Sequence, residues 1–140
     1  MEGKDLKHVL LIDDDETTNL LHGMIIREVF PKIRVSTASN GKEALDFIVA
    51  ANEDDDLPDL IFLDINMPVM DGWEFIKCYD ALGHQIQNSI VAFMITSSLN
   101  DMDKETARSN EHIDVFISKP ISPEILQEIC RDYFGIPNKN

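Results

Sequence analysis

The chain has 140 residues, about one domain's length, and its 44% hydrophobic and 27% charged residues are typical of a globular protein rather than a disordered one. Its formal net charge is −14, and a surface this acidic repels phosphate backbones, which argues against direct binding of DNA or RNA. Because no apolar run approaches the roughly 20 residues that span a bilayer and the first residues lack a signal-peptide pattern, we expect a cytoplasmic protein with no membrane contact.

Five short apolar runs, rich in Val, Ile, Leu and Phe, are predicted to be strands. Runs of this length with little polar alternation are typical of strands that are covered on both faces, as in a parallel sheet. In chain order the predicted strands are His8–Ile12, Ile33–Ala38, Leu60–Leu63, Ile90–Ile95 and Ile113–Ile117.

The segments between these strands have the apolar spacing of helices. The apolar stripes are Leu20, Leu21, Met24 and Ile25; then Ala44, Leu45, Ile48 and Val49; and finally Ile125, Leu126, Ile129, Cys130 and Tyr133. The segment Asp101–Asn110 is mostly polar and has almost no stripe, so we expect a weakly packed and mobile helix there.

Capping signals mark the starts of three of these helices. Asn40 with Glu43 and Asp71 with Glu74 have the spacing of a capping box, with Asn or Asp in place of Ser or Thr. Ser122 is followed by a proline, which is typical of an N-cap residue and the first turn of a helix.

The fivefold alternation of strand and helix predicts an α/β fold with a doubly wound parallel sheet. No linker or repeat divides the chain, so we expect a single domain over residues 1–140 with a core of about 7–134. Crossovers between parallel strands are right-handed, which places the carboxyl ends of all five strands at one edge of the sheet. Ligands of open α/β sheets bind at that edge.

Polar residues follow the strands at this edge. Asp13 and Asp14 follow the first strand, Asp64 the third, Thr96 the fourth and Lys119 the fifth. Two carboxylates ~4 Å apart repel by about 4 kcal/mol at an effective dielectric constant of 20. A divalent cation relieves this repulsion, and oxygen ligands without His or Cys favour Mg²⁺.

This set of groups suits phosphoryl transfer, in which catalysis consists mainly of positioning and charge neutralisation. The lysine supplies a second positive charge and the threonine hydroxyl a hydrogen bond. A carboxylate can itself be the nucleophile, which yields an acyl phosphate.

The order of these motifs resembles the receiver domain of two-component response regulators. Singly each motif is weak, but five in order over roughly Lys7 to Phe134 are specific. The matching features are the pair Asp13-Asp14, Asp64 followed by Met67-Pro68 and Asp71-Gly72, Thr96, and Lys119-Pro120. The resemblance implies a flavodoxin-like (βα)5 fold, similar to that of stand-alone chemotaxis regulators.

The resemblance also implies the metal site. Asp64 would be the phosphoacceptor. Asp14 and Asp64 would bind Mg²⁺ directly, together with the backbone carbonyl of Asn66, and Asp13 would hold the ion through water.

Further roles concern the phosphoryl group and the response to it. Thr96 and Lys119 would contact the phosphoryl group. Thr96 and the aromatic Phe116 would be the switch residues, on a face formed by the fourth helix, fifth strand and fifth helix. The Lys119–Pro120 peptide bond would be cis, as X-Pro bonds permit. A histidine kinase or a histidine phosphotransfer protein would donate the phosphoryl group, and a downstream protein would receive the signal. The chain would thus be a signalling phosphoacceptor that catalyses only its own phosphorylation and dephosphorylation.

Two other classes of protein share parts of this pattern. Residues 13–17 also match the Asp-x-Asp-x-Thr motif of haloacid-dehalogenase-type phosphohydrolases, with Asp13 as nucleophile and Asp15 as general acid. That hypothesis lacks the acidic pair required after Lys119 and leaves Asp64 unexplained, and Asp15 fits a helix cap better. A flavodoxin-type cofactor module is excluded because four consecutive acids, residues 13–16, occupy the loop where an anionic phosphate needs donors.

Overall fold

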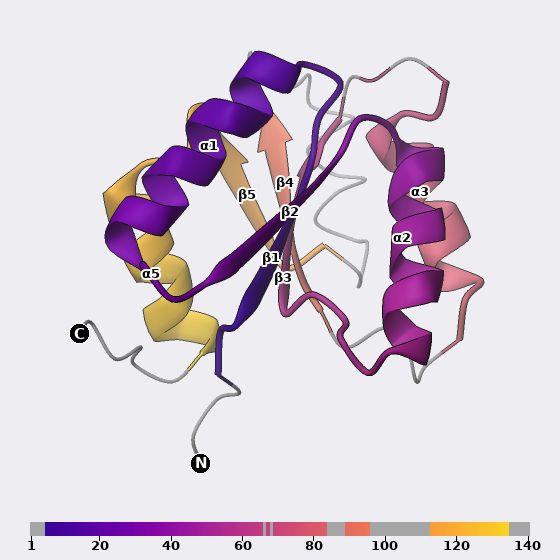
Figure 1. Cartoon of the computed structure of the whole chain (residues 1–140). Helices are drawn as coiled ribbons and strands as arrows, with labels where there is room; N and C mark the ends of the chain where they lie inside the picture. The colour runs from indigo at the N-terminus through magenta and orange to yellow at the C-terminus, as the bar shows by residue number, and fades with distance from the viewer. Residues whose placement is uncertain (1–4, 66, 68, 84–88, 96–112, 135–140) are drawn as a thin grey trace.

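Five parallel strands form one sheet in the order β2-β1-β3-β4-β5 (Figure 1). The structure is a computed structural model that describes residues 5–65, 67, 69–83, 89–95 and 113–134. The strands are β1 His8–Ile12, β2 Arg34–Ala38, β3 Leu60–Asp64, β4 Ile90–Ile95 and β5 Val115–Ser118. The predicted doubly wound α/β fold is therefore confirmed, with strand ends displaced by at most two residues.

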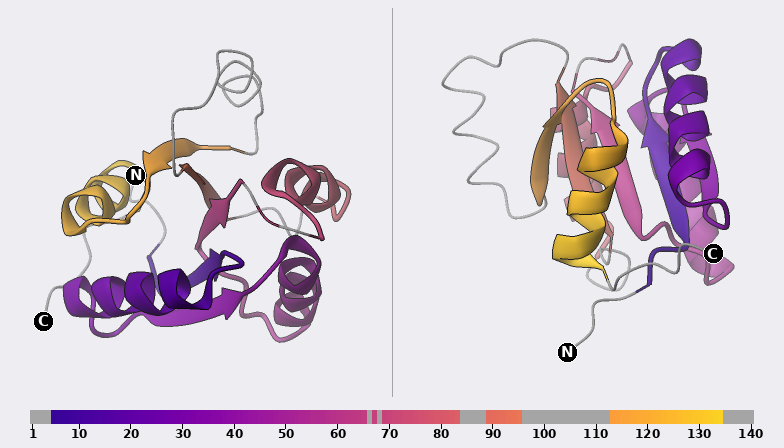
Figure 2. Two further views of the ribbon diagram at one scale, coloured as in Figure 1. Left: turned by 90° about the horizontal axis from the view of Figure 1, so that it is seen from above. Right: turned by 90° about the vertical axis from the view of Figure 1, so that its left-hand side faces the viewer.

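Helices cover both faces of this sheet, with α1 and α5 on one side and α2 and α3 on the other (Figures 1 and 2). Their bounds are α1 Glu16–Val29, α2 Gly41–Glu53, α3 Gly72–Asp80 and α5 Pro123–Tyr133. The helix predicted at Asp101–Asn110 lies outside the described residues.

The strands alternate between two apolar cores. Val9 and Leu11 of β1 belong to the core beneath α1 and α5, whereas Leu10 and Ile12 belong to the core beneath α2 and α3. All four side chains are fully buried. Successive side chains of a strand point to opposite faces, so a strand covered on both faces must be apolar at every position. This requirement explains the unbroken apolar runs at residues 9–12 of β1 and 60–63 of β3.

Most of the predicted apolar stripe of α1 does not face the core, and only Ile25 of its four residues packs against it. Leu20 and Met24 are 63% and 58% exposed. The helix instead buries Asn19, His22, Gly23 and Ile26, which follow the same helical spacing on a different face. Polar side chains are buried here because they hydrogen-bond to backbone groups at the edge of the sheet.

The capping predictions are confirmed. The Asp71 and Glu74 side chains form a reciprocal capping box at the start of α3. Ser122 Oγ accepts from Ile125 N at 3.1 Å at the start of α5, with Pro123 in the first turn. At α2, Asn40 accepts the Glu43 N–H, but the Glu43 carboxylate turns to Ser39 and accepts from its N–H and hydroxyl. Each cap fixes the direction in which the chain leaves the carboxyl edge of the sheet.

Candidate functional site

Three carboxylates meet at the carboxyl edge of the sheet. Ile12 of β1 is paired with Leu63 of β3, and the next residue of each strand is an aspartate, so Asp13 and Asp64 lie side by side. Asp14 follows in the β1–α1 loop. One carboxylate oxygen from each of these three residues lies within 4.8 Å of the others. Asp13 and Asp64 are 1% and 4% exposed, whereas Asp14 is exposed.

Lys119 neutralises part of this charge. It follows β5, which β4 separates from β3, and its long side chain spans that distance. Its Nζ lies 2.5 Å from Asp13 Oδ2 and 3.3 Å from Asp64 Oδ1. Burial acts to lower the pKa of Lys119, but the hydrogen bond to Asp13 and the negative charge of Asp64 outweigh it and hold the pKa above its ordinary value. The ammonium therefore stays charged at neutral pH.

The donor set fits a magnesium ion. Three carboxylates and one ammonium leave a formal charge of −2 on the cluster, which a divalent cation balances. The cluster offers oxygen ligands only, as Mg²⁺ prefers, and the exposed Asp14 opens it to solvent, which suits an ion that keeps several waters. Two of the three acids are buried at close range, and such an arrangement is unfavourable without compensating positive charge.

Backbone and amide groups fix the position of Asp13. Its N–H donates to the carbonyl of Ala38 at 3.1 Å, and its Oδ1 accepts from the N–H of Asp15 at 3.0 Å. The buried Asn19 side chain donates through Nδ2 to the Asp13 carbonyl at 3.0 Å and to the Ala38 carbonyl at 3.4 Å. The β1–α1 loop is thereby tied to β2 and to the first turns of α1.

The phosphohydrolase alternative finds no support in the site. Asp15 is the N-cap of α1 and accepts from the N–H groups of Thr17 and Thr18 at 3.0 and 3.4 Å. Hydrogen bonds from the Thr18 side chain and backbone lower the pKa of the Asp15 carboxyl, whereas a general acid needs a raised one.

The other predicted site residues are only partly covered by the structure. The Lys119–Pro120 bond is cis, as the resemblance implies. Phe116 on β5 is half-buried and packs against the core beneath α2 and α3. Asn66 and Thr96 lie outside the described residues, so their predicted roles stay predictions.

His22 is a buried residue to which the sequence assigned no role. It is fully buried on α1, and its Nε2 accepts from the N–H of Ile121 at 3.2 Å. That bond joins α1 to the segment that follows Lys119. A single histidine without metal-ligand spacing gives no sequence signal for such a contact.

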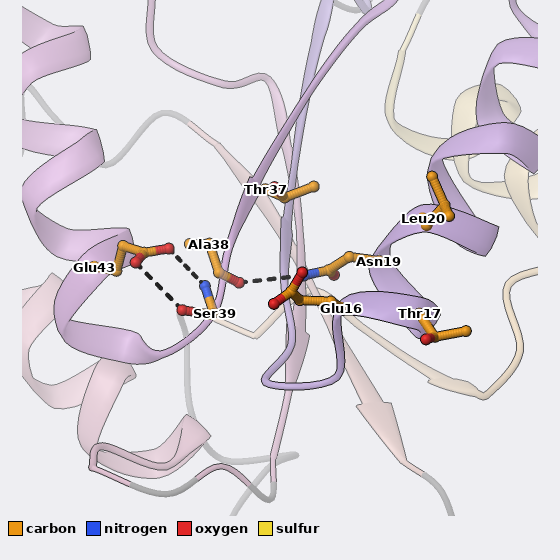
Figure 3. Close-up of a pocket in the computed structure, with 8 residues that line it drawn as sticks. All are labelled: Glu16, Thr17, Asn19, Leu20, Thr37, Ala38, Ser39 and Glu43. Atoms are coloured by element: carbon orange, nitrogen blue, oxygen red, sulfur yellow. Dashed lines mark hydrogen bonds between the residues drawn. The ribbon is translucent and has the colours of Figure 1, made fainter.

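A pocket of about 590 Å³ lies next to the acidic cluster, between the N-terminal half of α1 and the β2–α2 loop. It is lined by Glu16, Thr17, Asn19, Leu20, Thr37, Ala38, Ser39 and Glu43 (Figure 3). Figure 3 shows its walls held by the Asn19–Ala38 and Glu43–Ser39 hydrogen bonds. None of the predicted site residues in the described part of the chain lines it, so the pocket is separate from the acidic cluster.

None of the helices in the described ranges is long and apolar enough to cross a membrane.

Comparisons with known proteins agree with the fold. Residues 9–131 match the response regulator receiver domain. The chain is 33% identical to the chemotaxis protein CheY of Halobacterium salinarum, covering 88% of this chain and 93% of that protein. It is 32% identical to the polar-differentiation response regulator DivK of Brucella anthropi, with 92% and 97% covered.

A solved structure gives the same result. The crystal structure of a two-component response regulator from Cytophaga hutchinsonii superposes with a TM-score of 0.83 at 30% identity, covering 93% of this chain and 98% of that one. Receiver domains bind Mg²⁺ at an acidic pocket and work with histidine kinases and downstream targets, and nothing in the comparisons supports the phosphohydrolase alternative. The chain therefore belongs to the response regulator receiver family, and its role is that of a phosphoacceptor in two-component signalling.

Proposed function

We propose that Asp64 accepts the phosphoryl group and that Asp13, Asp14 and Asp64 hold the Mg²⁺ on which this transfer depends. The observation that carries the proposal is the convergence of these three carboxylates with the Lys119 ammonium in one cluster. The residues come from three strand ends that are far apart in the sequence. Such a combination of acids, open metal positions and one cation matches the requirements of phosphoryl transfer.

The chain's own groups divide the work between them. An oxygen of the Asp64 carboxylate attacks phosphorus, a P–O bond forms, the P–N bond to a donor histidine breaks, and its electron pair returns to the imidazole. When bound, Mg²⁺ supplies positive charge that offsets the charge of the phosphoryl oxygens and the carboxylates. Lys119, already 3.3 Å from Asp64 Oδ1, is within reach of the new phosphoryl oxygens. We assign Thr96 a hydrogen bond to the same group and Asn66 a backbone ligand to the metal, by resemblance to the family.

The signal follows from the change in charge. Phosphorylation converts the Asp64 carboxylate, with a charge of −1, into an acyl phosphate with a charge of about −2, so it adds about one unit of negative charge and new acceptor oxygens. Lys119 then exchanges partners within the cluster. The residue lies between β5 and α5, and its movement is transmitted to Phe116 on one side and to the start of α5 on the other. We infer that the face formed by the predicted fourth helix, β5 and α5 contacts a downstream protein. We infer further that a histidine kinase or a histidine phosphotransfer protein donates the phosphoryl group. We also infer that residues 1–140 act as one domain.

The test is to phosphorylate the chain with acetyl phosphate and Mg²⁺, trap the acyl phosphate by reduction with borohydride, and map the modified residue by mass spectrometry. We expect the modification on Asp64, dependent on Mg²⁺. Asp64→Asn should abolish it. Asp15→Asn is the matched control, because Asp15 is an exposed helix cap one residue from the metal ligands and should leave labelling intact.

Two results would contradict the proposal. One is phosphorylation of Asp13 or Asp14 in the wild-type chain to an extent comparable to that of Asp64. The other is undiminished labelling in the presence of a chelator that removes Mg²⁺.

A further inference from the structure

A buried hydrogen bond links helix α1 to the segment that carries Lys119. His22 Nε2 accepts from the backbone N–H of Ile121, 99 residues further along the chain, at 3.2 Å. His22 is 0% exposed and Ile121 is 1% exposed, so water does not compete for this bond. Ile121 lies two residues after Lys119.

The bond completes the anchoring of a short segment. After Lys119 the chain passes through the cis peptide bond to Pro120, buries the Ile121 side chain in the core beneath α1 and α5, and enters α5 at the Ser122 cap. The His22 bond is the contact that fixes the backbone N–H within this segment. It therefore sets the distance between the α1 helix and the point from which the Lys119 side chain leaves.

The protonation state of His22 is fixed by the geometry. An Nε2 that accepts a hydrogen bond carries no proton, so the ring is neutral and its proton is on Nδ1. Nδ1 is itself buried and has no hydrogen-bond partner within the part of the chain that the structure describes. A buried N–H without a partner is unfavourable, and an apolar side chain at this position would avoid the cost. What His22 provides in return is an acceptor for Ile121.

We propose that His22 is a positioning residue for Lys119: by holding the Ile121 N–H, it keeps the Lys119 ammonium 2.5 Å from Asp13 Oδ2 and 3.3 Å from Asp64 Oδ1, within reach of a phosphoryl group on Asp64. This inference rests on the proposed function of Asp64 and adds a residue outside the acidic cluster. His22 touches neither the carboxylates nor the phosphoryl group, and it acts through the backbone of the segment.

Two substitutions separate the hydrogen bond from packing. His22→Gln keeps an acceptor close to the position of Nε2, whereas His22→Leu fills the space without one. His8→Leu is the matched control, because His8 is also buried, at 3% exposure, and bonded through Nε2 to Ser36 Oγ at 2.7 Å. It lies at the first residue of β1, the opposite edge of the sheet from Lys119.

The measurements are the maximal rate of phosphorylation and the KM for acetyl phosphate at saturating Mg²⁺, with the Mg²⁺ affinity taken from calorimetry. We expect His22→Leu to lower the maximal rate by about threefold to tenfold, the range of one lost hydrogen bond, with little change in Mg²⁺ affinity. His22→Gln should recover most of the rate, and His8→Leu should leave it unchanged.

A spectroscopic measurement on the wild-type chain keeps the inference testable if His22→Leu does not fold. Long-range ¹⁵N–¹H correlation of the histidine rings should show His22 Nε2 unprotonated and hydrogen-bonded, with the proton on Nδ1. A proton on Nε2 would overturn the inference, as would a wild-type rate in folded His22→Leu or equal losses in His22→Leu and His22→Gln. Failure of the wild-type chain to label Asp64 would instead refute the proposed function, while the ring measurement would still show whether His22 Nε2 accepts the hydrogen bond from Ile121.

Discussion

Replacing Lys119 by methionine removes the cation from the acidic cluster while keeping most of the side-chain volume. The Lys119 side chain is 13% exposed, and its ammonium contacts two buried carboxylates, those of Asp13 and Asp64. In the variant these carboxylates face each other without the compensating charge. We expect the folded state to become less stable when Mg²⁺ is absent.

The magnitude follows from the distances. At an effective dielectric constant of 20, the ion pairs at 2.5 and 3.3 Å correspond to about 7 and about 5 kcal/mol of gross attraction. Desolvation offsets much of this, and removing one partner of a buried pair costs about 3 to 5 kcal/mol. One carboxylate can also take up a proton, which costs about 4 kcal/mol at pH 7 for an ordinary aspartate. We therefore expect a loss of about 3 to 4 kcal/mol at pH 7.

The pH dependence has a definite sign. The folded variant binds a proton in its acidic cluster more readily than the unfolded chain does. Its loss of unfolding free energy relative to wild type therefore becomes smaller as the pH falls. The expected change is about 1.4 kcal/mol per pH unit for one coupled proton. Mg²⁺ also reduces the deficit, because the ion replaces the missing charge and binds the variant more tightly than the wild-type chain.

Urea unfolding of Lys119→Met and wild type at pH 7 and pH 5, with and without Mg²⁺, measures these differences. Lys42→Met is the matched control: Lys42 pairs with Asp46 at 3.7 Å, but both side chains are at least 70% exposed, so the loss should stay below about 0.5 kcal/mol. If Lys119→Met were as destabilising as Lys42→Met, or its deficit grew on acidification, the electrostatic reasoning about the cluster would be refuted.

Three further predictions concern other parts of the fold. Burial, more than the charge of Arg34, lowers the pKa of His8 below its ordinary 6.5, so the free energy of unfolding is at its full value above pH 6.5 and falls below it. The slope of this decrease reaches about 1.4 kcal/mol per pH unit per histidine. Urea unfolding at pH 7.5 and 5.5 should show a lower free energy of unfolding at pH 5.5, and His8→Gln should make the difference between the two pH values smaller. Asp71→Ala removes the capping box of α3 and should cost about 1 kcal/mol of stability in the same assay, whereas an unchanged midpoint would show that the cap contributes nothing. Burial raises the pKa of the Cys130 thiol to about 11, so a thiol reagent at pH 8 should modify Cys130 only after unfolding, and rapid labelling of the folded chain would contradict that burial.

The sequence determined the fold and much of the site for a physical reason that can be named. Strands buried on both faces must be apolar throughout, so short apolar segments predict where these strands lie. Parallel strands with right-handed crossovers bring their carboxyl ends to one edge of the sheet. The sequence alone therefore predicts that Asp13, Asp14, Asp64 and Lys119 lie together at that edge. The capping residues Asp71 and Ser122 were equally readable, because a cap is a local interaction.

Tertiary structure alone decided which groups those segments bury and how the charges pair. The apolar residues Leu20 and Met24 suggested a core-facing stripe, yet α1 buries Asn19 and His22 beside Ile26 instead. The two polar side chains can be buried because they hydrogen-bond to backbone groups of Ala38 and Ile121. The burial of Asp13 beside the exposed Asp14, and the reach of one ammonium to two carboxylates, depend on distances between strand ends. The local sequence specifies the apolar periodicity of an element and its helix caps. The hydrogen-bond partner of a buried polar group lies far away in the sequence, so only the tertiary packing determines it.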